Sequence, residues 1–178
     1  MKRKKKVAVV HCYGGSELLA GIERAALKGD CTEILKSYPE GINACSYGCL
    51  GGGSCVNACK LHAISLNKNS AAVVSRELCV GCGLCVKACP QQIIHLVPAE
   101  NTIQPLCSNP SDAKTSRTVC GSSCIGCGIC EKNCPVGAAH VVDGCVVIDQ
   151  EKCIACGMCA VKCPRGVIHD ANGIFTSD

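Results

Sequence analysis

Three segments of this sequence place four cysteines at one shared spacing and follow the last cysteine with proline. Two residues separate each of the first three cysteines, three residues precede the fourth, and the segments span 79–90, 124–135 and 153–164. Thiolate sulfur is a soft ligand that suits iron, and close spacing lets one loop wrap an iron–sulfur cluster with its backbone N–H groups. The pattern therefore predicts electron transfer through thiolate-bound iron, a chemistry that needs no general acid or base.

Two other uses of cysteine compete with this interpretation. A disulfide scaffold is typical of secreted proteins, yet the basic start of the chain precedes an apolar run of only residues 7–10, too short for a signal peptide or membrane span. Zinc also binds four thiolates, but zinc ribbons use cysteine pairs, whereas these segments carry triplets. Because the chain has 21 cysteines, one Phe and no Trp in 178 residues, we expect clusters to supply part of its folding energy.

The spacing is the one that bacterial ferredoxins use, in which three thiolates hold one [4Fe–4S] cluster and the fourth ligates a second cluster. A looser segment, residues 45–59, precedes the three regular ones. The ferredoxin crossover predicts three ligand sets: Cys79, Cys82, Cys85 and Cys59; Cys124, Cys127, Cys130 and Cys163; Cys153, Cys156, Cys159 and Cys134. Cys89 is then left for the cluster of the looser segment.

The looser segment lacks one ligand of the regular pattern. Alignment on Cys130 and Cys134 places Gly52 opposite Cys127. The nearest substitute in sequence is Cys45, which gives a fourth predicted [4Fe–4S] set: Cys45, Cys49, Cys55 and Cys89. A [3Fe–4S] cluster held without Cys45 is the alternative.

Five cysteines remain outside these four sets. Cys145 occupies an apolar position in a predicted strand, which favours a buried thiol without a ligand role. The other four suffice for a fifth cluster that joins the N-terminal segment to the middle of the chain: Cys12, Cys31, Cys107 and Cys120. Free structural thiols are the alternative.

Short apolar runs separated by turn residues predict an α+β fold of two tandem ferredoxin-like modules with a small N-terminal strand–helix segment. Two β-hairpins are expected, at residues 63–74 and 139–149, the second with a two-residue Asp-Gly turn. Residues 167–175 predict a last hairpin. The expected domains are an N-terminal segment at 1–44, modules at 45–97 and 120–178, and a linker at 98–119 that packs back on a module.

The N-terminal segment predicts a strand at residues 6–11 and then a helix. Ser16 is a plausible cap, Gly29 a stop, and the apolar residues between them recur at helical spacing. A turn should follow at residues 39–41.

Charge argues against nucleic acid as a partner. The net charge is +4, but residues 2–6 are all basic, which leaves 13 Lys and Arg against 14 Asp and Glu in the rest of the chain. The body is nearly neutral, and basic residues are not interleaved with aromatic ones. No nucleophile triad, phosphate loop or dinucleotide fingerprint is present, so we expect electron sites without a catalytic site of the chain's own.

Three segments together resemble one family, the B subunits of the Rnf complexes, which are ion-pumping ferredoxin:NAD⁺ oxidoreductases. They are residues 10–15, 45–55 and 121–127, and the resemblance extends over residues 7–170. Members of that family begin with a membrane helix and a further four-cysteine cluster domain, which this sequence does not show.

The resemblance implies an electron-accepting arm. Soluble ferredoxin or flavodoxin would donate electrons to a chain of clusters, which passes them to other subunits of a membrane redox complex that exports Na⁺ or H⁺ and reduces NAD⁺. It implies a cytoplasmic location, peripheral at the membrane face. The alternatives are a free soluble polyferredoxin and the electron-transfer domain of another redox enzyme.

Overall fold

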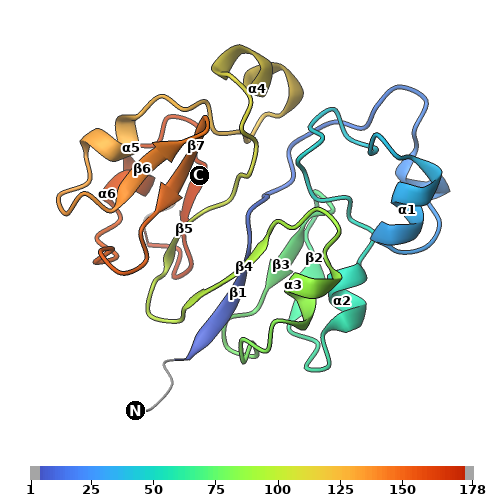
Figure 1. Ribbon diagram of the computed structural model, residues 1–178, viewed down its shortest axis with the longest axis horizontal. Helices are drawn as coiled ribbons and strands as arrows, with labels where there is room; N and C mark the ends of the chain where they lie inside the picture. Colours follow the sequence, from blue (N-terminus) through green and yellow to red (C-terminus); the bar gives the residue numbers. More distant parts are fainter. Residues whose placement is uncertain (1–4, 175–178) are drawn as a thin grey trace.

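The computed structural model describes residues 5–174 and contains two modules with the same order of elements (Figure 1). In each module, a first strand and an intervening segment with a short helix of its own are followed by a short helix, a β-hairpin, another short helix and a final strand. The final strand pairs antiparallel with the first. The predicted α+β class of two tandem ferredoxin-like modules is confirmed. The basic residues 2–4 of the predicted tail lie outside the described residues.

The first module includes the N-terminal strand. Its elements are β1 (Lys6–Val10), α2 (Ser54–Ala58), β2 (Ile64–Leu66), β3 (Ala72–Val74), α3 (Leu84–Ala88) and β4 (Ile94–Pro98). Strand β1 pairs with β4 in a register that sets Val7 opposite Val97 and Val10 opposite Ile94. The strand expected at residues 6–11 and the hairpin at 63–74 are therefore present.

The second module begins inside the segment expected to be a linker. Its elements are β5 (Ile103–Pro105), α4 (Ala113–Val119), α5 (Ile129–Lys132), β6 (Ala139–Val142), β7 (Cys145–Ile148), α6 (Met158–Val161) and β8 (Ile168–Asp170). Strand β5 pairs with β8, and Ile103 is buried. The domain boundaries at 45, 98 and 120 stay predictions, and the strand pairing favours modules that begin at β1 and β5.

Strand β8 has a different partner from the one predicted. Ile168 and Asp170 lie opposite Pro105 and Ile103 of β5, whereas a hairpin with residues 173–175 was expected. Residue 175 lies outside the described residues. The prediction of a terminal hairpin is wrong for β8 because a strand distant in sequence covers its edge.

The helix predicted between Ser16 and Gly29 is also wrong. Only a 3₁₀ turn, η1 (Arg24–Ala26), forms there. The backbone pairs with residues 42–44 instead: the N–H of Leu19 donates to Ile42 O at 2.9 Å. The Ser16 hydroxyl accepts from the Cys45 N–H at 2.8 Å and does not cap a helix, so tertiary pairing has overridden the local periodicity.

The helix of this region lies later, at α1 (Cys31–Ser37). Asp30 caps it by accepting from the N–H groups of Thr32 and Glu33, and the Glu33 carboxylate accepts from the Asp30 N–H. This reciprocal capping box satisfies donors that would otherwise be unpaired at the helix start. The cap fixes the position of Cys31 at the start of the helix. The turn expected at residues 39–41 follows the helix, where the Gly41 N–H donates to Tyr38 O.

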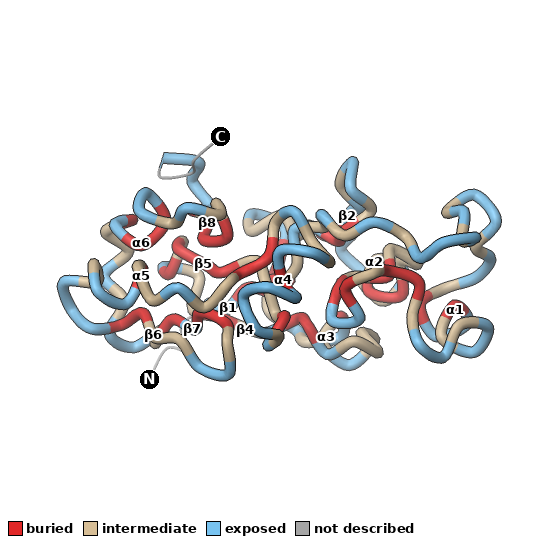
Figure 2. Tube along the Cα trace, turned by 90° about the horizontal axis from the view of Figure 1, so that it is seen from above, coloured by how far each residue is buried: buried red, intermediate tan, exposed pale blue. Residues whose placement is uncertain are grey.

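Each module has its own hydrophobic core, and the modules lie side by side (Figures 1 and 2). The cores consist of small and branched side chains together with cysteines, such as Val7, Ile94 and Cys55 in the first module and Ile103, Ile168 and Cys130 in the second. A third, smaller cluster packs α1 through Ile34 and Ile42. Cysteine sets therefore contribute directly to the interior.

The β6–β7 hairpin turns at Asp143 and Gly144, both with positive φ, at 47° and 77°. This is the type I′ geometry expected of an Asp-Gly turn. A Cβ on Gly144 would lie 2.7 Å from the backbone oxygen of Pro110, so the glycine also allows the segment after β5 to pack on the hairpin.

We expect Gly144→Ala to lower thermal stability more than Gly137→Ala does. Both glycines have positive φ, where a side chain costs about 1–2 kcal/mol, but a Cβ at Gly137 meets nothing within 4 Å whereas one at Gly144 meets backbone. Anaerobic melting followed by visible absorbance measures the difference. Equal melting temperatures for the two variants would contradict the close packing of Pro110.

Candidate iron–sulfur sites

In the second module, the two predicted cysteine sets each surround a cavity. Site III is lined by Cys124, Cys127, Cys130 and Cys163, with Val141, Val146 and Ile168 among its apolar walls. Site IV is lined by Cys134, Cys153, Cys156 and Cys159, with Ile103 and Ile148. Cys130 and Cys134 lie one turn apart on the α5 segment, so one short helix serves both sites. The grouping matches the ferredoxin crossover.

In the first module, the cavity called site I has a different fourth cysteine from the one predicted. It is lined by Cys31, Cys49, Cys55 and Cys89. Cys45, which was expected here, lies at another cavity. At this cavity the structure therefore favours Cys31, at the start of α1, over Cys45 as the fourth cysteine.

The physical reason for this exchange lies at Gly52. A Cβ on Gly52 would lie 2.6 Å from the backbone nitrogen of Cys31 and 2.7 Å from Cδ1 of Ile34. The first turn of α1 thus fills the space into which the equivalent residue of the second module, Cys127, projects. The absence of a cysteine at position 52 and the presence of Cys31 at this cavity therefore follow from one packing change. The Cys31 N–H donates to Ser54 Oγ at 3.0 Å.

Site II is the name we give to the predicted set of Cys59, Cys79, Cys82 and Cys85. The three cysteines of the triplet lie near one another, and burial acts with the neighbouring thiols of Cys79 and Cys82 to raise the pKa of Cys85. Cys59 is assigned to this set by equivalence with Cys134 of site IV, because both sulfurs accept a backbone N–H four residues later, from Ala63 at 3.3 Å and Ala138 at 3.1 Å.

A fifth cavity lies where the two modules meet, and we call its cysteines the junction site. They are Cys12, Cys45, Cys107 and Cys120. Three of these belong to the predicted fifth set; Cys45 replaces Cys31. Both differences from the predicted sets therefore amount to one exchange of Cys31 and Cys45 between neighbouring cavities.

The thiols of these cavities fit a metal cluster electrostatically. Burial raises the pKa of Cys55 to about 12 and that of Cys45, Cys130 and Cys159 to about 11. Such thiols ionise readily only when positive charge is close, and bound iron provides it. Backbone donors are already in place, such as Ala8 N–H to Cys79 Sγ and Val167 N–H to Cys163 Sγ, both at 3.4 Å.

Cys145 belongs to none of these five sets. It is buried, its thiol donates to Cys107 O at 3.3 Å, and it also contacts the thiols of Cys107 and Cys124. Hydrogen bonding from Cys145 lowers the pKa of Cys107 and of Cys124, while the same contacts raise the pKa of Cys145. The Cys145 thiol therefore lies between site III and the junction site.

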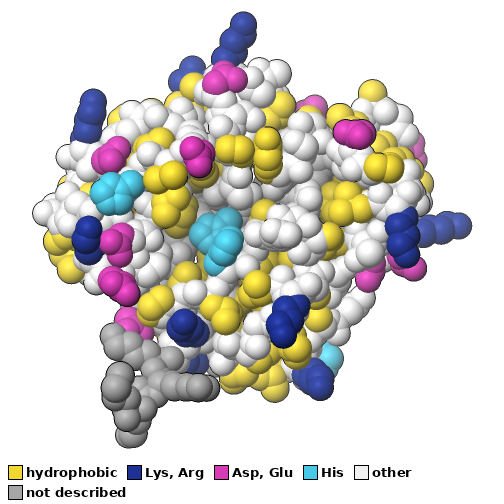
Figure 3. Space-filling view, viewed as in Figure 1, with side chains coloured by type: hydrophobic (Ala, Val, Ile, Leu, Met, Phe, Trp, Pro, Cys, Tyr) yellow, Lys and Arg dark blue, Asp and Glu magenta, His cyan; other side chains and the backbone are white. Residues whose placement is uncertain are grey.

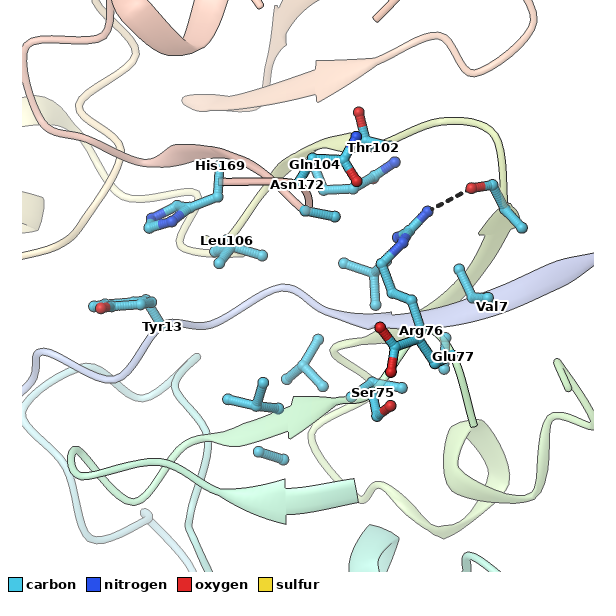
Figure 4. Close-up of a pocket in the computed structure, with 18 of the residues that line it drawn as sticks. Val7, Tyr13, Ser75, Arg76, Glu77, Thr102, Gln104, Leu106, His169 and Asn172 are labelled. Carbon is cyan, nitrogen blue, oxygen red and sulfur yellow. Dashed lines mark hydrogen bonds between the residues drawn. The ribbon is translucent and has the colours of Figure 1, made fainter. Parts of the chain in front are cut away.

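A groove lies between the modules (Figure 4). Strands β1 and β3 form one wall, while Gln104, Leu106 and His169 come from the second module. Tyr13 stacks on His169 with ring centroids 4.9 Å apart, and Arg76 donates to Ala99 O at 2.9 Å. Cys12 lines both this groove and the junction cavity, so the groove reaches the junction site.

The face seen in Figure 3 carries Lys, Arg, Asp and Glu side chains scattered among apolar ones. This agrees with the nearly neutral body expected from the sequence. Within residues 5–174, no helix is long and apolar enough to cross a membrane, and no group of three or more His, Cys, Asp or Glu side chains is arranged to hold a metal ion. The cysteines of sites I, III and IV and of the junction site line cavities instead.

Comparison with family models decides between the metals considered above. Models described as "4Fe-4S dicluster domain" match residues 43–96 and 78–138, together more than half of the chain, and a "4Fe-4S binding domain" model matches residues 146–169. The chain therefore contains 4Fe–4S domains in tandem. Iron–sulfur binding is thereby favoured over zinc and over a disulfide scaffold.

The curated relatives carry one kind of name, the B subunit of an ion-translocating complex. The chain is 38% identical over 148 residues to the B subunit of the Na⁺-translocating ferredoxin:NAD⁺ oxidoreductase complex of Acetobacterium woodii, covering 83% of this chain and 44% of the relative. It is 37% identical over 136 residues to the proton-translocating counterpart of Clostridium ljungdahlii, covering 68% and 48%. It is 36% identical over 149 residues to the B subunit of the ion-translocating oxidoreductase complex of Methanosarcina acetivorans, covering 84% and 56%.

These matches confirm the resemblance to the family of Rnf B subunits. The chain spans about half the length of the curated relatives it matches. What the whole relatives do in their complexes is therefore carried to this chain only as a proposal.

We expect Gly52→Ala to damage site I. The added methyl group collides with the backbone at Cys31, so α1 must move and its thiol leaves the cavity; iron should fall by about one to four atoms per chain. Iron analysis of anaerobically purified protein measures this. Gly121→Ala is the matched control, because its Cβ would meet only Gly15 O at 3.7 Å; equal iron in the two variants would contradict the assignment of Cys31.

Proposed function

We propose that this chain transfers electrons through [4Fe–4S] clusters as the ferredoxin-accepting subunit of an Rnf-like, ion-translocating membrane complex. The observation that carries the proposal is the repeated grouping of four cysteines around cavities in a chain similar to the B subunits of such complexes. The named relatives differ in their coupling ion, Na⁺ or H⁺, so the proposal covers either one.

Four cluster sites follow from the two dicluster modules. The proposed ligands are those of sites I to IV: Cys31, Cys49, Cys55 and Cys89; Cys59, Cys79, Cys82 and Cys85; Cys124, Cys127, Cys130 and Cys163; Cys134, Cys153, Cys156 and Cys159. With Cys31 as a fourth thiol, site I favours a [4Fe–4S] over a [3Fe–4S] cluster. We assign Cys45 to the junction site and not to site I.

The protein's own residues supply surroundings for electron transfer. A bound cluster would exchange single electrons at a potential set by hydrogen bonds to its sulfurs and by solvent exposure. Backbone N–H groups donate to the ligand sulfurs of Cys79, Cys134 and Cys163. Apolar walls such as Ile148 and Ile168 limit water at sites IV and III. No proton transfer by these residues is required.

The proposed partners are a soluble ferredoxin or flavodoxin as donor and further subunits of the membrane complex as acceptors. A freely diffusing carrier benefits from a surface with a large excess of charge of one sign, because this charge steers its encounters with partners. The body of this chain has 13 basic and 14 acidic residues and so has no large excess of either charge. A peripheral position at the cytoplasmic face of the membrane fits this role.

Electron acceptance is tested with the purified, anaerobic protein and a reduced low-potential ferredoxin. We expect the visible iron–sulfur absorption of this chain to bleach on mixing, because its clusters accept electrons from the ferredoxin. The same protein loaded with zinc is the control and should show no change. A fully loaded protein that stays oxidised would contradict the proposed donor.

Complex membership is tested by fractionating native cell extracts anaerobically. We expect the chain to sediment with membranes and to copurify with integral membrane subunits after mild detergent extraction. Recovery of the chain alone in the soluble extract would favour the free polyferredoxin alternative. Copurification with a soluble enzyme would favour the third hypothesis, an electron-transfer domain.

A further inference from the structure

The junction site is built from equivalent positions of the two modules. Cys12 follows the end of β1 by two residues, and Cys107 follows the end of β5 by two residues. Cys45 and Cys120 each precede the first cysteine of a cluster segment, Cys49 or Cys124, by four residues. Each module thus contributes the same pair of thiols.

The hydrogen bonds around these pairs repeat as well. Cys12 Sγ accepts from the Cys49 N–H at 3.3 Å, and Cys107 Sγ accepts from the Cys124 N–H at 3.3 Å. Each of these contacts joins a junction thiol to the first ligand of a neighbouring site, so the junction site lies directly between sites I and III.

The loops that carry Cys45 and Cys120 are braced in the same manner. Gln91, two residues after Cys89, donates to Ser46 O at 2.9 Å and Gly48 O at 3.0 Å. Arg165, two residues after Cys163, donates to Gly121 O and to Ser123 O. Since Gly121 and Ser123 are the counterparts of Ser46 and Gly48, both modules hold this loop by an equivalent side chain.

Direct contacts close the two halves against each other. The Gly121 N–H donates to Gly15 O at 3.0 Å, and Ser108 Oγ donates to Tyr47 O at 3.1 Å. A Cβ on Gly15 would lie 2.7 Å from Ser122 Oγ. The segment after β1 therefore reaches the second module at the point where the four thiols gather.

From this arrangement we propose that Cys12, Cys45, Cys107 and Cys120 hold a fifth [4Fe–4S] cluster shared by both modules, and that it is the middle member of the order II–I–junction–III–IV. The proposal rests on the proposed function and deepens it. Sites I and II share the α2 segment through Cys55 and Cys59, and sites III and IV share the α5 segment. The junction site therefore connects the two modules into one continuous path for electrons.

Iron counting tests the ligand set directly. We expect about twenty iron atoms per native chain and about sixteen in the double variant Cys12→Ala/Cys120→Ala, which removes one ligand from each module. A triple variant that adds Cys45→Ala to this double variant should lose no further iron, because Cys45 belongs to the same junction site. A triple variant that adds Cys31→Ala instead should contain less iron than the double variant, because Cys31 belongs to site I.

Cys145→Ala is the matched control. The first module carries Ala71 at the equivalent hairpin position, so the substitution copies a residue that this fold already accepts. Its iron content should equal that of the native chain. Loss of about four iron atoms there would make Cys145 a ligand and overturn the proposed set.

The outcomes separate this proposal from the proposed function. A native chain with about sixteen iron atoms, unchanged in the double variant, overturns the junction cluster and leaves the electron-transfer function standing. A native chain without iron overturns both. If the double variant does not fold, Cys12→Ala alone decides: a new [3Fe–4S] electron paramagnetic resonance signal supports the site, and an unchanged spectrum contradicts it.

Discussion

The structure depends on gathering thiols in fours inside a chain that has few large side chains. With one Phe and no Trp, the modules bury valine, isoleucine and alanine against cysteine sulfur. Burial keeps several of these thiols protonated well above neutral pH, so the ionised ligands need the positive charge of a metal. Helices as short as α5 and α6 gain little from their own hydrogen bonds, and their position follows from the cysteines they present.

Much of the fold and of the candidate sites could be predicted from local sequence. The Cys-x₂-Cys-x₂-Cys-x₃-Cys-Pro spacing predicts three cysteines of site III and three of site IV, because that information lies in a dozen neighbouring residues. The ferredoxin crossover adds the fourth cysteine of each site from the other segment. The Asp143-Gly144 turn is equally local. The position of Cys145 in a strand, without a place in any set, also followed from its apolar surroundings.

The exchange of Cys31 and Cys45 could not be predicted in this way, because it depends on how α1 docks. Gly52 was visible as a missing ligand, but only the structure shows that the first turn of α1 fills its space. Two local signals point toward it: the Asp30–Glu33 capping box, which marks the start of α1, and the equal offset of Cys45 and Cys120 from their segments. The helix predicted at residues 16–29 does not form, because the backbone of this segment pairs with residues 42–44.

The central claim is that the cysteines of this chain form five sites in a row, with one shared by both modules. Anomalous diffraction at the iron absorption edge, from crystals of the anaerobically purified protein, tests it most directly. The account predicts five separate iron centres. The middle centre lies between Cys12 and Cys107, and Cys31 is a ligand of the adjacent centre at site I. Four centres with no iron between the modules, or an iron centre ligated by Cys45 together with Cys49 and Cys55, would contradict it.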